Sequence, residues 1–81
     1  MAGKPEATFK IGPCSASVFV NEVENDGTKR RFRSVNVQRS YKDGDVRKYK
    51  PSFGLDNLPQ AIRVLQLAQQ YVEQKEAEIN G

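Results

Sequence analysis

The chain has 81 residues with one Cys and no His, and its 13 Lys and Arg against 10 Asp and Glu give a net charge of +3. This length allows a single domain, near the lower limit at which a hydrophobic core suffices without disulfides or metal ions. One Cys excludes an intramolecular disulfide and a cysteine-built metal site, and the lack of His removes the commonest general base. We therefore expect a protein that is not an enzyme and holds no metal ion or cofactor.

Membrane and secretory segments are not evident. No apolar run approaches the ~20 residues that a helix needs to span a bilayer. Residues 1–10 lack the apolar segment of a secretory signal. We expect a cytoplasmic protein with no membrane partner, and its small size favours a homodimer as a way to bury more surface.

The positive charge is concentrated in one segment. Residues 29–50 contain nine Lys and Arg against two Asp, a net charge of +7, whereas the other four basic and eight acidic residues leave −4. Such segregation produces a local positive potential that the small total charge hides. Positive charge near aromatic rings favours a single-stranded nucleic acid as the partner. The aromatic residues in question are Phe19, Phe32, Tyr41 and Tyr49.

The first elements along the chain are a tail and a short strand. Residues 1–6 are polar and contain Gly and Pro, which predicts a disordered tail before a single domain over residues 7–79. Residues 7–11 alternate weakly and fit a short edge strand. Gly12-Pro13 ends that strand.

Two longer strands follow, joined by a tight turn. Residues 14–24 alternate between apolar and polar side chains, which is typical of a half-buried strand. Asp26-Gly27 supplies the positive φ angles of a hairpin turn. Residues 29–41 form the next strand, and residues 42–44 the next turn.

The register of these strands can be predicted by aligning their apolar residues. An even-numbered loop at the first turn places Val18 opposite Val35. A three-residue loop with a bulge at Gly44 places Val37 opposite Tyr49. Both choices predict one inner face, made of Ala16, Val18, Val20, Val35, Val37, Tyr49 and Phe53.

The last element is a helix that begins near Leu58 and runs to about Glu78. The apolar period changes there from two to 3.6, with one stripe made of Leu58, Ala61, Ile62, Leu65, Ala68 and Val72. Pro59 fits the first turn, and either Asp56 or Asn57 is a suitable N-cap. The predicted fold is α+β: a four-stranded antiparallel sheet followed by one long helix that packs on one face, in the order β-β-β-β-α.

If the helix covers the valine face, alternation leaves the other face open to solvent. Two Phe rings on such a face gain nothing for folding, but each can stack on a base for about 1–3 kcal/mol. Lys and Arg neutralise phosphates, and amides read base edges. The residues expected on this face are Ser15, Ser17, Phe19, Asn21, Arg30, Phe32, Ser34, Asn36, Gln38, Ser40, Lys48 and Lys50.

Two alternatives stay open. Phe19 and Phe32 can instead pack against a second sheet in a homodimer or against the first short strand. The helix also has a second apolar stripe, Val64, Leu67 and Tyr71. This stripe is either a dimer contact or part of one wide core-facing surface.

A family resemblance rests on three runs of residues: 17–21 (SVFVN), 34–44 (SVNVQRSYKDG) and Ser52-Phe53 before the helix. Over residues 7–75 the chain resembles small bacterial proteins similar to the positive-cofactor-four and Whirly type of single-stranded DNA-binding proteins. The resemblance implies a curved four-stranded sheet with a helix, dimerisation, and binding of single strands across the sheet. The positions it implies for nucleic-acid contact are Phe19, Asn21, Phe32, Asn36, Gln38, Arg39, Lys48 and Lys50.

Two functions compete at this point. The first is a binder of single-stranded DNA or RNA with weak sequence specificity. The second is a protein-interaction module that docks an acidic protein partner. A steep loss of affinity with salt and the effect of replacing Phe19 or Phe32 would favour the first.

Overall fold

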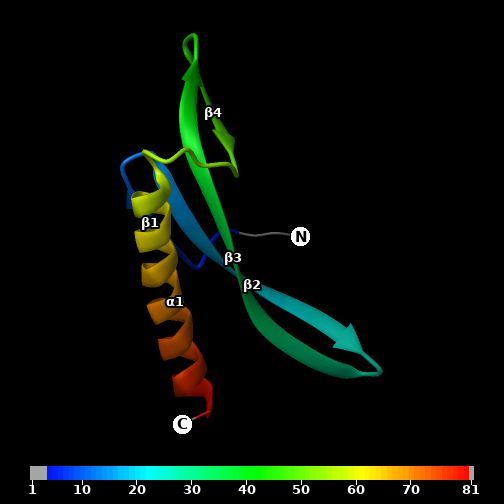
Figure 1. Ribbon diagram of the computed structural model, residues 1–81. Helices are drawn as coiled ribbons and strands as arrows, with labels where there is room; N and C mark the ends of the chain where they lie inside the picture. The colour runs from blue at the N-terminus through cyan, green and yellow to red at the C-terminus, as the bar shows by residue number, and fades with distance from the viewer. Residues whose placement is uncertain (1–3, 81) are drawn as a thin grey trace.

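The computed structural model of the protein describes residues 4–80, and the side chains of residues 4–77. Its elements are β1 (Ala7–Ile11), β2 (Cys14–Asn25), β3 (Thr28–Asp43), β4 (Val46–Lys50) and α1 (Leu58–Asn80). The strands form one antiparallel sheet in the order β1-β2-β3-β4, and α1 packs across one face of it (Figure 1). The predicted β-β-β-β-α fold is confirmed.

The register of the first long hairpin is as predicted. Val18 lies opposite Val35 and Ala16 opposite Val37. Asp26 and Gly27, the two turn residues, have φ angles of 54° and 77°, as a type I′ turn requires at both central positions. This turn fixes which side chains of β2 and β3 share a face.

The register predicted for the second hairpin is wrong. Tyr49 lies opposite Ser40 rather than Val37, because the loop consists of the two residues Gly44-Asp45. Gly44 has a φ angle of 67°, which suits the first position of a type II′ turn. An odd shift in register moves every side chain of a strand to the other face.

This shift exchanges two groups of residues. Tyr49 lies on the face that points away from α1, not in the core. Lys48 pairs with Tyr41 and Lys50 with Arg39, so both lysines lie on the helix side of the sheet, contrary to the prediction. Phe53 is half-buried and packs against the core from the loop after β4.

The helix begins at Leu58, and the structure decides between the two candidate caps. The carbonyl of Asn57 accepts the first intrahelical bond, from the Ala61 N–H at 2.9 Å. Asn57 is therefore the N-cap residue. Its side chain donates to Gln60 Oε1 at 3.3 Å, and its carbonyl also lies 3.6 Å from the thiol of Cys14 in β2. These contacts join the start of the helix to the sheet.

Small side chains form the contact between helix and sheet. The buried apolar residues are Cys14, Ala16 and Val18 of β2, and Ala61, Val64 and Ala68 of α1. Side chains of this size let a helix lie close to the surface on which it packs. The partly buried residues around them are Ala7, Phe9, Ile11, Val35, Val37, Phe53, Tyr71 and Val72.

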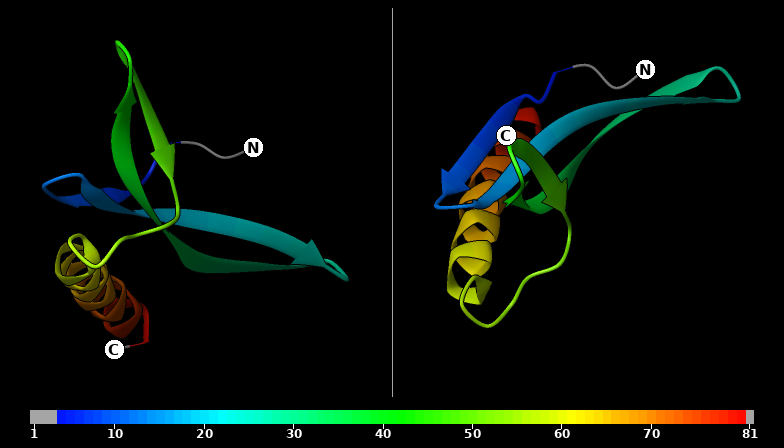
Figure 2. Two further views of the ribbon diagram at one scale, coloured as in Figure 1. Left: turned by 45° about the horizontal axis from the view of Figure 1, so that its top comes forward. Right: turned by 90° about the horizontal axis from the view of Figure 1, so that it is seen from above.

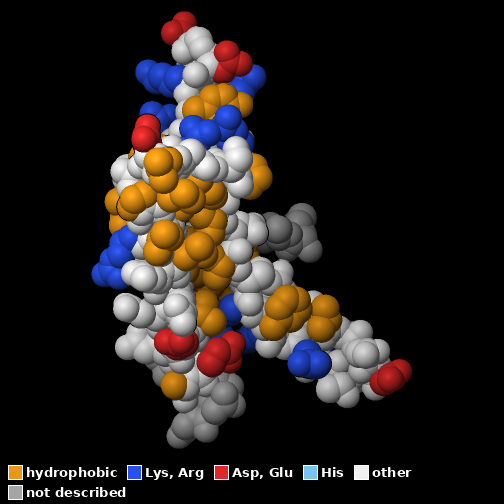
Figure 3. All heavy atoms as spheres, viewed as in Figure 1, with side chains coloured by type: hydrophobic (Ala, Val, Ile, Leu, Met, Phe, Trp, Pro, Cys, Tyr) orange, Lys and Arg blue, Asp and Glu red, His pale blue; other side chains and the backbone are white. Residues whose placement is uncertain are grey.

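The predicted core stripe of the helix was wrong in part. Ala61, Ala68 and Val72 face the core as predicted. Leu58, Ile62 and Leu65 do not: they are 40%, 54% and 44% exposed. We call these three residues the exposed helix stripe. Figure 3 shows hydrophobic side chains gathered over the first half of α1, where this stripe lies.

The second predicted stripe belongs to the core instead. Val64 is fully buried, and the Tyr71 ring meets Phe9 edge-on with 6.0 Å between ring centroids. Leu67 is half-buried. This stripe is therefore not free to form a dimer contact. Val64 and Tyr71 belong to a wide surface of the helix that faces the core, which was the other interpretation. Both stripes are apolar, so hydrophobicity alone did not fix the rotation of the helix.

An ion pair around Arg33 holds the end of the core opposite the helix start. The Arg33 side chain is 7% exposed and donates to both Glu6 carboxylate oxygens, at 2.7 and 3.2 Å, and Glu76 of α1 lies 3.9 Å away. The backbone N–H of Glu6 donates to the Val18 carbonyl at 2.7 Å. A disordered tail was expected over residues 1–6, of which residues 1–3 lie outside the described part of the chain. At Glu6 the chain is already bound to the sheet.

The molecule is elongated, with extents of 48 × 26 × 17 Å. Its radius of gyration is 15.1 Å, against about 12 Å for a compact domain of this length. Two hairpins account for the difference, because the ends of β2–β3 and of β3–β4 project beyond the helix in different directions (Figure 2). Over the described residues no helix has the length and hydrophobicity that crossing a membrane requires.

Candidate nucleic-acid interface

The sheet has one face that α1 leaves open, which we call the outer face. Its members follow from the strand register, because residues paired across antiparallel strands point to the same side. They include Thr8 and Lys10 of β1, Ser15, Ser17, Phe19, Asn21 and Val23 of β2, Arg30, Phe32, Ser34, Asn36, Gln38, Ser40 and Lys42 of β3, and Arg47 and Tyr49 of β4. The three carboxylates within the strands, Glu22, Glu24 and Asp43, all fall on the helix side.

Three aromatic rings lie on the outer face. Phe32 is 46% and Tyr49 52% exposed, and Phe19 is half-buried. Phe32 pairs with Asn21, two residues along from Phe19, so the two Phe residues are diagonal neighbours about 7–8 Å apart. The alternation on which the binding hypothesis depends is therefore present: Val18 is buried beneath the helix and Phe32 is exposed to solvent on the other face.

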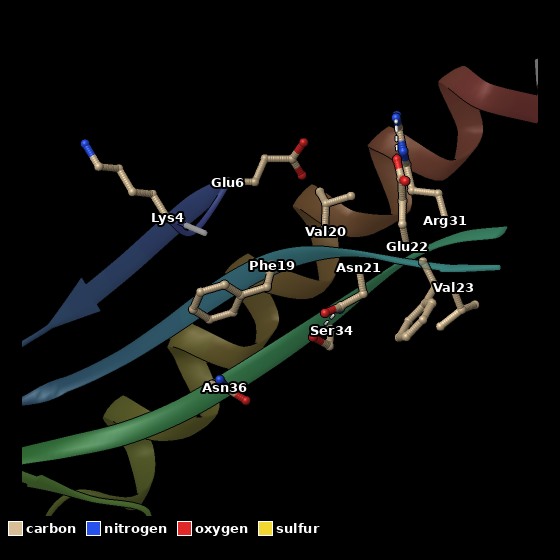
Figure 4. A pocket seen from close by; sticks show the side chains of 11 residues that line it. Lys4, Glu6, Phe19, Val20, Asn21, Glu22, Val23, Arg31, Ser34 and Asn36 are labelled. Carbon is tan, nitrogen blue, oxygen red and sulfur yellow. Dashed lines mark hydrogen bonds and ion pairs between the residues drawn. The ribbon is translucent and has the colours of Figure 1, made fainter. Parts of the chain in front are cut away.

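A shallow depression of about 670 Å³ surrounds the Phe residues. In Figure 4, Phe19, Asn21, Ser34 and Asn36 lie along β2 and β3 with α1 behind the strands. Glu6 and Glu22 also line the depression, but their charges are paired with Arg33 and with Arg31. The lining offers an aromatic surface, polar groups and no unpaired carboxylate among the described residues.

The polar groups on this face are amides and hydroxyls. Asn21 Nδ2 donates to Ser34 Oγ at 2.9 Å, and Thr8 Oγ1 lies 3.3 Å from Ser17 Oγ. Asn36 is exposed and Gln38 half-buried, and their amides make no side-chain hydrogen bond within residues 4–77. Such groups can donate to and accept from the edges of bases.

Basic residues on the two faces differ in their partners. On the helix side, Arg31 pairs with Glu22 at 3.5 Å, Lys48 with Asp43 at 3.0 Å, and Lys50 lies over the Tyr41 ring at 4.9 Å. On the outer face the basic residues are Lys10, Arg30, Lys42 and Arg47, all exposed. Within the described side chains none of these four makes an ion pair.

Three of the predicted contact residues lie apart from the site. Arg39 Nε donates to the Ser52 carbonyl at 3.0 Å and so ties β3 to the loop after β4. Lys48 and Lys50 project on the opposite face. The structure brings together the others: Phe19, Asn21, Arg30, Phe32, Asn36 and Gln38.

Tyr49 and Arg47 were missed as outer-face residues by sequence reasoning. Their place depends on the length of the Gly44-Asp45 loop. A two-residue loop with Gly at its first position would have given the correct pairing. Once that loop is chosen, Tyr49 falls beside Ser40 and Arg47 beside Lys42.

The resolved pKa shifts belong to groups on the helix side. The hydrogen bond from Arg33 lowers the pKa of Glu6 below its ordinary value, and the same bond raises the pKa of Arg33. Burial, together with the negative charge of Glu6, raises the pKa of Tyr71, and burial raises that of the Cys14 thiol. No group of three potential metal ligands occurs among the residues described.

Comparison of the chain with protein-family models, with curated proteins and with solved structures finds no match. The resemblance to the positive-cofactor-four and Whirly type therefore stays a prediction.

Proposed function

We propose that the protein binds single-stranded nucleic acid, DNA or RNA, across the outer face of its sheet with weak sequence specificity. One observation carries the proposal: the outer face combines Phe32, Phe19 and Tyr49 with four unpaired basic residues and no strand carboxylate. A flat surface with rings and positive charge matches a ligand that has bases and phosphates. A cytoplasmic location belongs to the same proposal.

The energetics favour stacking as the source of affinity. Each base stacked on an aromatic ring contributes about 1–3 kcal/mol, whereas each phosphate contact is screened by salt. Phe32 and Tyr49 already stand in water, so stacking removes apolar surface that folding leaves exposed. The unpaired cations attract the strand to the face, and the rings hold it there.

Fluorescence anisotropy with a labelled oligo-dT tests this proposal. We expect binding at low salt, with the logarithm of the affinity falling by about 0.7 per phosphate contact against the logarithm of salt. Phe32→Ala should weaken binding by about tenfold, the equivalent of 1.4 kcal/mol. Leu55→Ala is the control, because Leu55 is 83% exposed and lies in the loop before α1 rather than on the outer face.

Three outcomes would contradict the proposal. One is no binding of oligo-dT at low salt by protein shown to be folded. Another is an equal loss of affinity in Phe32→Ala and Leu55→Ala. The third is a stable complex with an acidic protein that oligo-dT does not displace, which would favour the interaction module instead.

The proposal includes a homodimer, with its contact on the exposed helix stripe rather than on Val64, Leu67 and Tyr71. A second copy would cover three large apolar side chains that one chain leaves in water. Light scattering after size exclusion should give the mass of two chains, and Ile62→Ser with Leu65→Ser should give the mass of one. Gln70→Ala, an exposed helix position, should leave the mass unchanged. A wild-type mass of one chain would remove the dimer from the proposal.

A further inference from the structure

The β3–β4 hairpin, residues 39–50, projects from the body of the protein; we call it the basic ribbon. Among the described elements β4 contacts only β3, and all five β4 residues are exposed. Figures 1 and 2 show the hairpin extending past the start of α1, which does not cover it. The β4 strand and the projecting end of the ribbon therefore take no part in packing on the helix.

Basic side chains lie on both sides of the ribbon. Lys42 and Arg47 are on the outer face, and Lys48 and Lys50 are on the helix side. Figure 3 shows Lys and Arg atoms on both sides of this hairpin and acidic atoms at its tip. A single strand lying on the outer face reaches only the first pair, so the second pair is left without a role in that complex.

Lys48 and Lys50, the second pair, contribute little to the stability of the fold. Lys48 pairs with Asp43, but the two side chains are 50% and 65% exposed, and such surface pairs contribute little to stability. Lys50 lies over the Tyr41 ring at the surface. A phosphate can therefore take either lysine without disturbing the core.

A ligand that reaches both sides must surround the ribbon. The major groove of B-form DNA is about 12 Å wide, admits a two-stranded ribbon, and has a phosphate backbone along each wall. Side chains project from the two faces of a ribbon, and packed sheets lie about 10 Å apart, so a ribbon that stands on its edge fits the groove and turns one face to each backbone. The five paired residues span about 17 Å, at about 3.3 Å per residue.

The other projecting hairpin shows that this charge pattern is specific to one arm. Residues 22–31 carry three acidic residues, Glu22, Glu24 and Asp26, against Lys29, Arg30 and Arg31. Residues 42–50 carry four basic residues against two acidic ones. The first arm is neutral overall and the basic ribbon is positive, although both are exposed two-stranded hairpins.

We propose that the basic ribbon enters the major groove of duplex DNA and contacts phosphates on both walls, making it a second nucleic-acid site. The duplex contact stands by itself. Its consequence for the whole protein, a preference for DNA in which a duplex continues into a single strand, rests on the proposed function of the outer face. In that arrangement the ribbon holds the duplex and the outer face holds the tail.

Anisotropy titrations with four probes test the inference: a blunt DNA duplex, an RNA duplex of the same sequence, oligo-dT, and a duplex with a dT tail. Lys48→Gln with Lys50→Gln should weaken blunt-duplex binding about tenfold and reduce the salt slope by about 2, while oligo-dT binding changes little. The matched control is Lys29→Gln with Arg63→Gln, which removes the same charge from the helix side of the other hairpin and from an exposed position of α1. The control should change neither.

The duplex RNA separates groove insertion from simple charge attraction. The major groove of A-form RNA is deep and narrow, so the ribbon should bind the RNA duplex at least about tenfold more weakly than the DNA duplex. Equal binding of both duplexes, equal losses in the two double variants, or no binding of duplex DNA would each overturn the inference. Loss of oligo-dT binding alone would remove the proposed function and the tail preference, and would leave the duplex contact standing.

Discussion

The two faces of this sheet are made from alternate residues of the same strands, and they use their side chains in opposite ways. On the helix side, Val18 is buried and Arg33 is enclosed by Glu6 and Glu76. On the outer face, Phe32 stays half in water and Arg30 has no ion-pair partner among the described side chains. The helix side satisfies its groups within the chain, whereas the outer face leaves them available.

This difference predicts which residues determine the stability of the fold and which determine binding. A residue whose contacts are all internal affects the free energy of unfolding when it is changed. A residue that makes no contact within the chain affects only the affinity of a complex when it is changed. Because strand neighbours point to opposite faces, adjacent residues provide the sharpest test.

Val18 and Phe19 form such a pair, and their substitution should give the largest contrast in stability. Val18→Ala removes two buried methyl groups and leaves a cavity, so we expect a loss of about 2 kcal/mol in the free energy of unfolding. Phe19→Ala should cost less than about 1 kcal/mol, because Phe19 is only half-buried and lies outside the core cluster. Urea unfolding followed by circular dichroism measures both values.

The same pair should reverse its order in binding. Phe19→Ala is expected to weaken the oligo-dT complex, whereas Val18→Ala should bind normally at temperatures where it is folded. If Phe19→Ala proves as destabilising as Val18→Ala, the ring is a structural residue. The comparison between the two faces would then fail at this position.

The basic residues should show a smaller contrast, in the salt dependence of single-strand binding. Arg30→Gln with Arg47→Gln removes two outer-face charges and should reduce the slope by about 1.4, at 0.7 per phosphate contact. Lys29→Gln with Arg63→Gln removes two charges that do not lie on the outer face, one from the helix side of β3 and one from α1, and should leave the slope unchanged. Anisotropy at several salt concentrations gives both slopes. Similar reductions in the two variants would mean that total charge, not the outer face, determines binding.

The sequence was sufficient to predict the fold and the first hairpin, because clear alternation and a diagnostic turn agree there. Asp26-Gly27 permits a two-residue loop, and that loop aligns Val18 with Val35. The burial of one face then fixes the register, since a slip of β3 by one residue would turn Val35 and Val37 to the open face. Phe19 and Phe32 follow from this alignment without further information.

The second hairpin had no comparable constraint. Residues 46–50 alternate without an apolar face, and a strand that is polar on both sides specifies its register weakly. Two aromatic residues, Tyr49 and Phe53, made an inward register attractive, but Tyr49 faces solvent and Phe53 lies beyond the strand. Lys48 and Lys50 moved to the other face as a result.

The rotation of the helix was also beyond sequence reasoning. An apolar surface made of Leu58, Ile62 and Leu65 adjoins one made of Ala61, Val64 and Ala68, and hydrophobicity ranks the larger residues higher. The smaller residues face the sheet, where they form the close contact with β2. Arg33 presents the same difficulty, because its partners Glu6 and Glu76 come from opposite ends of the chain.

The Arg33 ion pair supplies the smallest expected effect and tests the helix side itself. Because Arg33 lowers the pKa of Glu6 in the folded protein, the ionised carboxylate stabilises the fold above its ordinary pKa of about 4.5. That contribution is lost as the pH falls through the lowered folded-state pKa.

The melting temperature of the wild type should therefore fall more steeply than that of Glu6→Gln between about pH 6 and about pH 3. Glu73→Gln is the control, since Glu73 is exposed and, among the described side chains, accepts a hydrogen bond only from Gln69 of the same helix. Parallel acid profiles for wild type and Glu6→Gln would show that Glu6 contributes nothing through its charge. The ion pairing of Arg33 would then rest on Glu76 alone.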